Sequence, residues 1–195
     1  MIASVDLSLR STGIIALDDN KNLIDFKLVK SKPNEGKTKK ERENGLPILN
    51  DEDLIIFNSS EIIWFINTVC AKNVLDAILI EGLSFNSKSG SKDILAGNAW
   101  LLRVELKRTF SKVPIHIIPV QSWRSKILNK QDRADAKAKY GKKWQKEGVV
   151  EKLPEEVKGK FVSYITKNKF DKTGLFDLAD AFAMGVYYLD YVEGK

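Results

Sequence analysis

The stretch that decides the fold is MIASVDLSLRSTGIIALDDNKNLIDFKLV, residues 1–29. β-Branched and other apolar residues dominate three short runs in it, Met1–Asp6, Gly13–Leu17 and Leu23–Val29. Polar, turn-forming residues separate these runs, so each run has the composition of a strand bounded by turns. Strands that are joined by short turns lie side by side and run in opposite directions. The sequence therefore predicts an antiparallel meander of three strands at the start of the chain.

Beyond this meander, helical and strand patterns alternate. Segment 51–71 is apolar around most of its circumference, as in a buried helix, whereas 74–80 is a nearly continuous apolar run, as in a central strand. Further patterns predict a helix over Ile94–Phe110, a strand over Val113–Val120 and a last helix over Thr173–Tyr191 that Thr173 caps. This order predicts an α/β fold that resembles ribonuclease H. Its mixed five-stranded sheet has three antiparallel strands, then parallel strands, and helices on both faces.

Two segments stand out from this alternation. Residues 31–50 are rich in Lys, Glu, Asn and Gly with almost nothing to bury, which predicts a flexible, exposed loop. Residues 122–169 are rich in lysine and predict a basic helical insertion with a break near Gly148. A length of 195 residues accommodates both segments within a single domain over residues 1–195.

The positive charge of the chain is regional. The whole sequence has 32 Lys and Arg against 26 Asp and Glu, a net charge of +6. Residues 121–172 have 15 basic and 7 acidic side chains, 15 − 7 = +8, which leaves 6 − 8 = −2 for the remainder. A local basic excess is typical of a surface that neutralises phosphates, although many basic helix faces are only solvated.

Several functional classes are disfavoured by what the sequence lacks. No apolar stretch approaches the roughly 20 residues that a membrane span needs, and Asp6 falls where a signal peptide would be apolar. The single Cys70 fits a reducing compartment and rules out an intrachain disulfide. The only histidine, His116, lies in the apolar run IHIIPV and is expected to be structural, so Ser-His-Asp and Cys-His relays are unsupported. No G-x-x-x-x-G-K-[ST] phosphate loop occurs.

Four acidic residues are attached to elements that otherwise bury themselves. Asp6 ends the first strand, Glu81 ends the apolar strand AILI, and Asp177 and Asp180 lie one turn apart in FDLADAFAMGVYYL. Singly, each acid has an ordinary explanation, such as ending a strand, pairing with a lysine or complementing a helix dipole. Together they favour a metal site, because buried charges are paired or bind metals and because Mg²⁺ prefers carboxylate oxygens.

These motifs resemble those of the RuvC-type Holliday junction resolvases of bacteria and phages. MIASVDLSLRSTGIIALD, ILIEG and FDLADAFAMGVYYL are similar to the three acidic motifs of that family. The resemblance implies that Asp6, Glu81, Asp177 and Asp180 bind magnesium and that a homodimer cuts four-way DNA junctions. A glutamate at a strand end, as Glu81 is, favours this branch over ribonuclease H proper. The resemblance also implies a location in the cytoplasm of a bacterium or of a phage-infected host.

If the four carboxylates gather, they are expected to hold two Mg²⁺ ions about 4 Å apart, with Mn²⁺ as a substitute. One ion would activate a water for attack on the phosphodiester, and the other would stabilise the leaving 3′ oxygen. The resemblance implies that cleavage leaves a 5′ phosphate and a 3′ hydroxyl. Metal ions would thereby replace the histidine base that the sequence lacks.

A junction also needs contacts to its phosphates. The resemblance places an aromatic residue just beyond the glutamate, which suggests Phe85, with Lys88 in the same loop. The basic candidates are Arg124, Lys126, Lys137, Lys139, Lys142, Lys143 and Lys146. The last four follow helical spacing on one face. This pattern is as typical of a solvated helix surface as of a DNA-binding one. Residues 31–50 and 131–147 depart from the bacterial pattern and resemble phage relatives.

Symmetric resolution requires two active sites, so a homodimer is expected. The candidate interface is the helix Ile94–Phe110, because its apolar residues exceed what one sheet-facing side needs. These residues are Leu95, Trp100, Leu101, Leu102, Val104 and Leu106.

Three alternatives remain open. One is a ribonuclease H-like nuclease that acts on flaps, other branched DNA or RNA. Another is a non-catalytic nucleic-acid-binding module with structural acids. A third, an actin-like phosphotransferase, requires two lobes, and 195 residues accommodate one.

Overall fold

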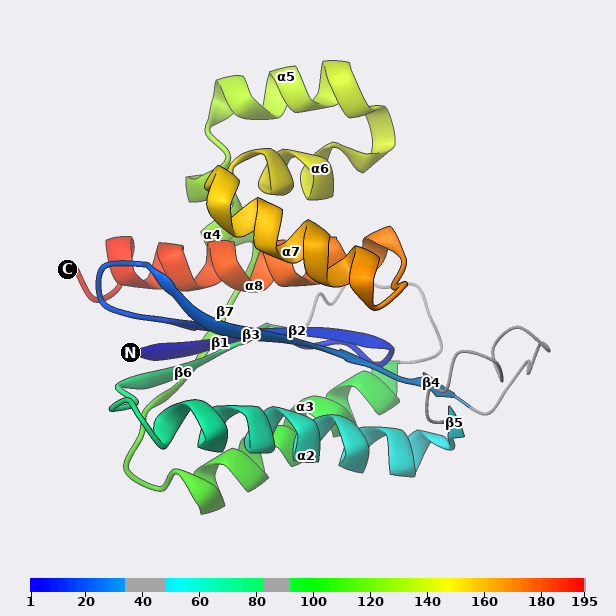
Figure 1. Ribbon diagram of the computed structural model, residues 1–195, viewed down its shortest axis with the longest axis vertical. Coiled ribbons are helices and arrows are strands. Elements are labelled where there is room, and N and C mark those ends of the chain that lie inside the picture. Colours follow the sequence, from blue (N-terminus) through cyan, green and yellow to red (C-terminus); the bar gives the residue numbers. More distant parts are fainter. Residues whose placement is uncertain (34–47, 83–91, 195) are drawn as a thin grey trace.

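The computed structural model describes residues 1–33, 48–82 and 92–194 and is built around one five-stranded sheet of order β3-β2-β1-β6-β7 (Figure 1). Its first three strands are antiparallel neighbours: β1 (Ile2–Asp6), β2 (Ser11–Leu17) and β3 (Leu23–Lys30). The other two are parallel to β1: β6 (Ala77–Glu81) and β7 (Ile115–Ile118). The predicted mixed sheet is therefore confirmed.

Helices cover both faces of this sheet, as predicted (Figure 1). One face is covered by α2 (Asp51–Cys70) and α3 (Lys92–Thr109). The other face is covered by α8 (Lys172–Tyr191), on which α4 (Val120–Ile127), α6 (Trp144–Glu151) and α7 (Glu155–Lys167) pack. The helix α5 (Lys130–Tyr140) lies beyond α6, farthest from the sheet, and a 3₁₀ turn, η1 (Gly141–Lys143), joins the two.

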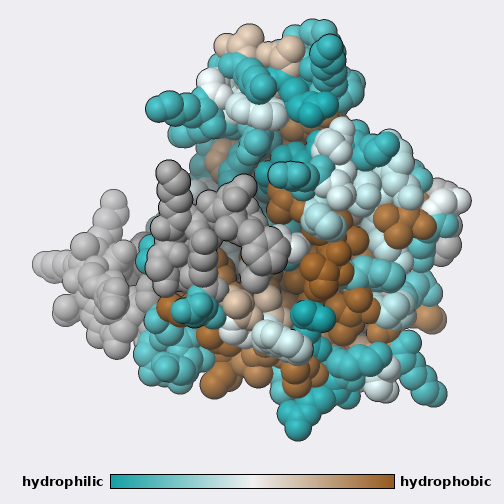
Figure 2. Space-filling model, turned by 180° about the vertical axis from the view of Figure 1, so that it is seen from behind, coloured by the Kyte–Doolittle hydropathy of each residue, from teal (hydrophilic) through white to brown (hydrophobic). Residues whose placement is uncertain are grey.

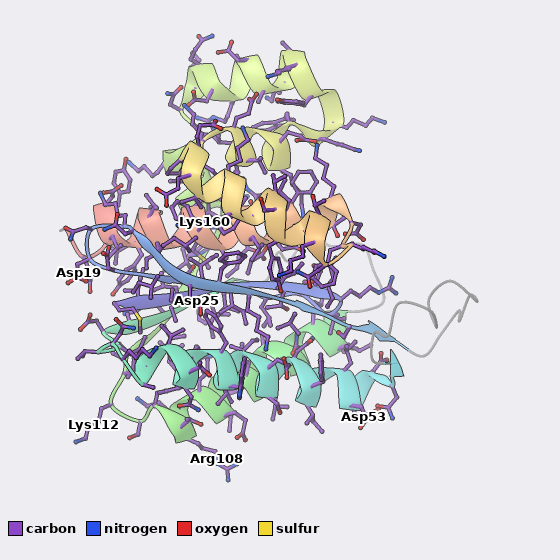
Figure 3. The ribbon with its side chains drawn as sticks, viewed as in Figure 1. Asp19, Asp25, Asp53, Arg108, Lys112 and Lys160 are labelled. Carbon is purple, nitrogen blue, oxygen red and sulfur yellow. The ribbon has the colours of Figure 1, made fainter. Side chains whose placement is uncertain are left out.

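The alternation of side chains along the strands creates two separate cores. Ala3 and Val5 of β1 point into the core beneath α2 and α3, whereas Ile2 points into the core beneath α8. Charged side chains such as Arg108 and Lys160 lie outside both cores and point toward solvent (Figure 3). Within the described part of the chain, no helix is long and apolar enough to cross a membrane.

The segment predicted as a loop over residues 31–50 is structured at both ends. Strand β4 (Lys32–Pro33) pairs in parallel with β5 (Ile48–Leu49), so the prediction was too long at these ends. Two-residue strands are too short to show a period in the sequence, which is why the pattern missed them. Residues 34–47 lie outside the described residues.

The basic section 122–169 is helical, but its break is not where the sequence suggested. Gly148 lies inside α6, where it is buried and faces Ala136 of α5. The chain instead breaks at Gly141, which has a φ of 55°, a backbone conformation that favours glycine. The prediction of a break at Gly148 was wrong, because a helical glycine can also serve close helix packing.

Candidate active site

The pleat of two neighbouring strands brings Asp6 and Glu81 to the same face of the sheet. Strands β1 and β6 are parallel, and Val5 pairs with Ile80, so Asp6 and Glu81 follow next at the carboxyl ends of both strands. Ser4 shares the face of Asp6 and donates a hydrogen bond of 2.7 Å to the carbonyl of Ala181 in α8. Both acids therefore belong to the face that α8 covers.

The other two acids come from α8 itself. Asp177 and Asp180 are one turn apart, and only 6% and 3% of their surfaces are exposed. The start of the helix is capped by Asp171, which accepts a hydrogen bond of 3.1 Å from the backbone N–H of Thr173. Lys30 of β3 donates to the Asp171 carboxylate at 3.0 Å and so ties this helix end to the sheet. The prediction that Thr173 is the cap was wrong by two residues, since its hydroxyl donates to Asp171 instead.

A glycine opposite Asp6 allows α8 to approach the sheet. Gly13 is the partner of Asp6 in the β1–β2 register. A Cβ atom at this position would lie 2.2 Å from the carbonyl oxygen of Asp177, closer than any side chain tolerates. Gly13 therefore lets the backbone of α8 rest directly on β2, which brings Asp177 toward the strand acids.

The four acids are close enough to perturb one another. Burial raises the pKa of the Asp6 carboxyl well above its ordinary value, and the negative charges of Glu81, Asp180 and Asp177 raise it further. Burial raises the pKa of Asp180 to about 7, although Arg124 opposes the shift. Burial also raises the pKa of Asp177, against the hydrogen bond from Ser11. The site therefore holds more negative charge than its own surroundings stabilise.

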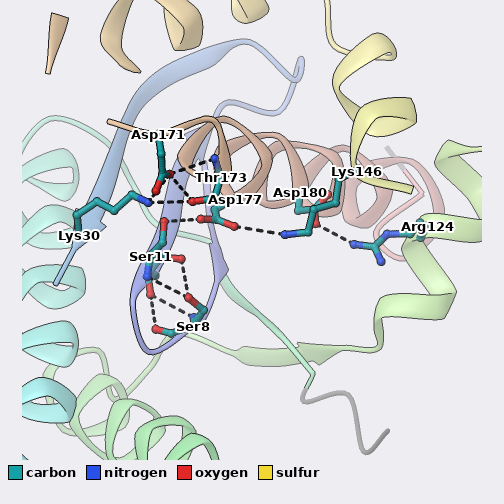
Figure 4. Close-up of polar contacts among 10 residues, drawn as sticks. Ser8, Ser11, Lys30, Arg124, Lys146, Asp171, Thr173, Asp177 and Asp180 are labelled. Carbon is teal, nitrogen blue, oxygen red and sulfur yellow. Dashed lines mark hydrogen bonds and ion pairs between the residues drawn. The ribbon is translucent and has the colours of Figure 1, made fainter. Parts of the chain in front are cut away.

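Two cations of the basic helical section reach this site (Figure 4). Arg124 of α4 donates from Nη2 to Oδ2 of Asp180 at 2.8 Å. The Nζ atom of Lys146 in α6 lies 3.7 Å from Oδ1 of Asp177, whose other oxygen accepts a hydrogen bond from Ser11. The neighbouring Glu147 forms an ion pair of 2.7 Å with Lys172, which fastens α6 to the start of α8.

Some carboxylate oxygens at the site have no hydrogen-bond donor. Oε1 of Glu81 and Oδ1 of Asp180 are both buried and unpartnered. Such oxygens, among acids with raised pKa values, suit a hard divalent cation, which is the ligand chemistry that Mg²⁺ prefers. In the described residues, however, no three His, Cys, Asp or Glu side chains are arranged as a ready metal site. Two of the four acids instead contact Arg124 and Lys146.

The remaining predicted DNA-binding residues lie away from the acids or cannot be placed. Phe85 and Lys88 fall outside the described residues. Lys126 lies over the ring of Tyr191 at 5.3 Å. Within the α5–α6 region, Lys137 lies over Trp144 at 4.9 Å, and Lys142 and Lys143 are exposed in η1.

The prediction that Lys139, Lys142, Lys143 and Lys146 share one helix face was wrong. The helix α5 ends at Tyr140, and the turn at Gly141 gives the segments before and after it different directions. Lys139 is engaged with Glu151 at 2.5 Å, whereas Lys146 faces the acids. Helical spacing continued through a break does not keep side chains on one face.

Three residues at the site escaped the sequence reasoning: Ser11, Gly13 and Lys30. The short polar-to-apolar transition Ser11–Thr12–Gly13 was a faint signal, since a glycine inside a strand often marks a close backbone approach. His116 lies on β7, the edge strand of the sheet, where its Nε2 is 3.2 Å from the hydroxyl of Tyr188 in α8. This contact agrees with the structural role expected for the histidine.

The sheet order and the helices on both faces define an α/β fold of the ribonuclease H-like type. Among solved structures, the chain is similar to Thermus thermophilus RuvC in complex with a Holliday junction substrate. The TM-score is 0.52 at 12% identity, over 97% of this chain and 95% of that chain. A second Thermus thermophilus RuvC structure gives 0.50 at 13% identity, over 95% and 93%.

The yeast mitochondrial Holliday junction resolvase Ydc2 is similar to the same degree. Its TM-score is 0.52 at 14% identity, over 96% of this chain and 77% of that chain. No protein-family model matches the sequence, and no curated protein sequence matches it. These similarities confirm the predicted RuvC-like, ribonuclease H-like fold.

Proposed function

We propose that this chain is a divalent-metal-dependent endonuclease that resolves four-way DNA junctions by symmetric phosphodiester cleavage. The observation that carries the proposal is the convergence of Asp6, Glu81, Asp177 and Asp180 at one edge of the sheet, with buried oxygens that no donor satisfies. The shared fold supports it, because one similar structure contains a Holliday junction substrate. The activity would serve DNA repair or recombination in a bacterial or phage-infected cytoplasm.

In this proposal the four acids hold two Mg²⁺ ions, with Mn²⁺ as a substitute. When bound, such ions supply a hydroxide nucleophile at neutral pH and stabilise charge on the leaving oxygen. Asp6 and Glu81 provide ligands from the ends of two central strands, whereas Asp177 and Asp180 provide them from the buried part of α8, residues 174–185. Ser11 orients Asp177 by hydrogen bonding to one of its oxygens.

DNA would be held by cations around the acids and by the basic helical section. Arg124 and Lys146 are near enough to the acids to contact the phosphate that is cut. Lys142 and Lys143 are exposed beyond them and would contact phosphates of a junction arm, together with Lys126 and Lys137. Phe85, Lys88 and Lys139 keep their proposed DNA-binding roles from the sequence, and Lys139 would first have to leave Glu151.

A second copy of the chain is the proposed partner at the outer face of α3. Trp100 and Val104 are 64% and 42% exposed there, and they line a hollow of about 370 Å³ with Ile115. Seen from behind, the molecule exposes brown apolar surface below the hydrophilic section at its top (Figure 2). The two-fold symmetry of a four-way junction favours a symmetric dimer.

The structure corrects two residues of the expected interface. Leu102 and Leu106 are fully buried against the sheet, so they belong to the core of one chain. Trp100→Glu, rather than a change at Leu102, is therefore the appropriate test of dimerisation by light scattering. A mass near that of one 22.0 kDa chain at micromolar concentration, with and without junction DNA, would contradict symmetric resolution.

The decisive experiment is a cleavage assay in Mg²⁺. It compares a mobile four-way junction with flap, fork, duplex and RNA–DNA hybrid substrates of the same sequence. Paired incisions in the junction, faster than cuts in any other substrate, support the proposal. Preferential cutting of flaps or hybrids would favour the nuclease alternative. DNA binding without Mg²⁺ binding in calorimetry would favour the non-catalytic module.

A further inference from the structure

The contact between Arg124 and Asp180 is an ion pair between a half-buried arginine and a buried carboxylate, and it uses only part of its bonding capacity. The two side chains are 18% and 4% exposed. One hydrogen bond of 2.8 Å joins Nη2 to Oδ2. The Nε atom of Arg124 and the Oδ1 atom of Asp180 are also buried, yet neither has a hydrogen-bond partner.

This arrangement does not maximise the stability of the pair. A guanidinium and a carboxylate can form two parallel hydrogen bonds, which would satisfy the remaining donor and acceptor. Buried polar groups without partners cost free energy, so a pair held by one bond is easier to exchange for another partner. The unpartnered Oδ1 atom of Asp180 is thus available as a ligand for a metal ion, and the unpartnered Nε atom of Arg124 is available as a donor to an anion.

Arg124 follows a buried tryptophan that fixes its place on α4. Trp123 is fully buried in the core beneath α4, and the Arg124 guanidinium lies 4.6 Å from the centre of its ring. The buried Trp123 therefore fixes the position of the neighbouring Arg124 backbone, and its ring forms one wall beside the guanidinium. Lys146 is a weaker counter-ion, since its side chain is 47% exposed and it lies 3.7 Å from Asp177.

We propose that Arg124 is a positioning residue that couples metal binding to DNA binding. Without DNA, its guanidinium is the counter-ion of Asp180 and competes with the divalent metal for that carboxylate. A DNA phosphate at the site accepts the guanidinium, which binds phosphate and carboxylate in the same forked geometry, and so releases Asp180 to the metal. This inference rests on the proposed function.

Thermodynamic linkage makes the coupling measurable from either side. If bound DNA raises the affinity of the protein for metal by a certain factor, bound metal must raise its affinity for DNA by the same factor, here called the coupling factor. A site with this property takes up metal chiefly when substrate is present. Removal of the guanidinium should therefore strengthen metal binding in the absence of DNA and reduce the coupling factor.

The test uses Ca²⁺ as the metal probe, which allows titration without measuring cleavage. Calorimetry measures the Ca²⁺ affinity of the full chain with and without a four-way junction. Arg124→Gln should bind Ca²⁺ about tenfold more tightly than wild type without DNA, because a nearby positive charge is removed. Its coupling factor should fall toward one. Arg124→Met, which keeps apolar bulk against Trp123, should behave in the same way if the glutamine variant is unstable.

The matched control is Arg108→Gln, which makes the same chemical change at an exposed position of α3, on the opposite face of the sheet. Arg108 forms an ion pair with Glu105 of its own helix, so Ca²⁺ affinity and the coupling factor should stay near wild type. Arg124 variants that match this control, or that bind Ca²⁺ more weakly, would overturn the role of Arg124 while leaving the metal site intact. Wild type that binds no Ca²⁺ even with DNA would instead refute the proposed function itself.

Discussion

The two faces of the sheet bury different kinds of side chain. Beneath α2 and α3, residues such as Val5 and Ile80 pack in an apolar core whose buried polar groups are uncharged. Beneath α8, the same strands bury Asp6, and α8 adds Asp177 and Asp180. In the described parts of the chain, these three are the charged side chains that are buried. The α2–α3 face therefore contributes stability, whereas the α8 face gives up stability to hold charges that a metal and a substrate would neutralise.

The largest expected effect is the loss of cleavage when one acid on the α8 face is neutralised. Asp6→Asn should lower the rate of junction cleavage in Mg²⁺ by roughly a thousandfold or more, the scale of removing a principal electrostatic group. Glu81→Gln, Asp177→Asn and Asp180→Asn should have similar effects. Asp53→Asn, at an exposed position on α2, serves as the control with the same chemical change.

Binding of the junction separates this result from misfolding. The four variants should still bind junction DNA in Ca²⁺, because they lack metal ligands and keep their phosphate-binding cations. A variant that cleaves at the wild-type rate would remove its residue from the proposed site.

The next largest effect concerns the close approach that assembles the charged face. Gly13→Ala should destabilise the fold by about 1–3 kcal/mol, since overpacking forces the backbone to shift, and should weaken metal binding as α8 moves away. Gly159→Ala is the matched control, because no atom lies within 4 Å of its added Cβ. It should stabilise α7 by about 0.5–1 kcal/mol. Equal unfolding midpoints for both variants in urea would disprove the close contact.

An intermediate effect is expected from the residue that orients Asp177. Ser11→Ala should reduce metal affinity or cleavage by roughly 10- to 100-fold, as changes to groups that support metal ligands do. Ser125→Ala removes a hydroxyl that bonds only within α4 and should change neither. Because a packing defect would lower stability alone, metal affinity from calorimetry should be compared with the thermal midpoint. Unchanged affinity would show that Ser11 does not orient the acid.

A smaller effect is the pH dependence of stability in metal-free protein. The pKa values of Asp6 and Asp180 are raised in the folded state, that of Asp180 to about 7, so the native state binds protons more tightly than the unfolded chain. The free energy of unfolding should therefore fall as pH rises from ordinary carboxyl values near 4 toward 7.

Urea denaturation in EDTA at pH 5.5 and pH 7.5 tests this sign. Metal-free wild type should be more stable at the lower pH, and Mg²⁺ should restore stability mainly at the higher pH. Asp6→Asn should reduce the difference between the two pH values. Higher stability at pH 7.5 without metal would contradict the proposal that the ionised acids on the α8 face lower the free energy of unfolding.

The smallest effect is expected from single exposed cations remote from both cores. Replacing Lys142 and Lys143 with Gln should weaken junction binding and reduce its salt slope by roughly one unit for each phosphate that the protein no longer neutralises. The exposed pair Lys107 and Arg108 on α3, changed to Gln, controls for net charge. Identical slopes for the two double variants would assign η1 to ordinary solvated surface.

Most of the fold could be predicted because local patterns carry it. The β-branched and apolar composition of Met1–Asp6 and the apolar strand before Glu81 identified strands, and the apolar circumference of 51–71 identified a helix. The same patterns singled out the acids, because a charge attached to a buried element is visible without a structure. Patterns failed where a residue has two possible uses, as Gly148 does as a helix break or as a packing surface.

The sequence by itself determined which segments are strands and helices and which acids are attached to buried elements, because burial leaves apolar runs of characteristic length between turn-forming residues. Only the tertiary structure decided which side chains meet. Ser11 contacts Asp177, and Arg124 contacts Asp180, across 166 and 56 residues of sequence. Such contacts depend on strand register and on how closely α8 packs on β2 at Gly13. No local pattern encodes these distances, because they are set jointly by elements that are far apart in the chain.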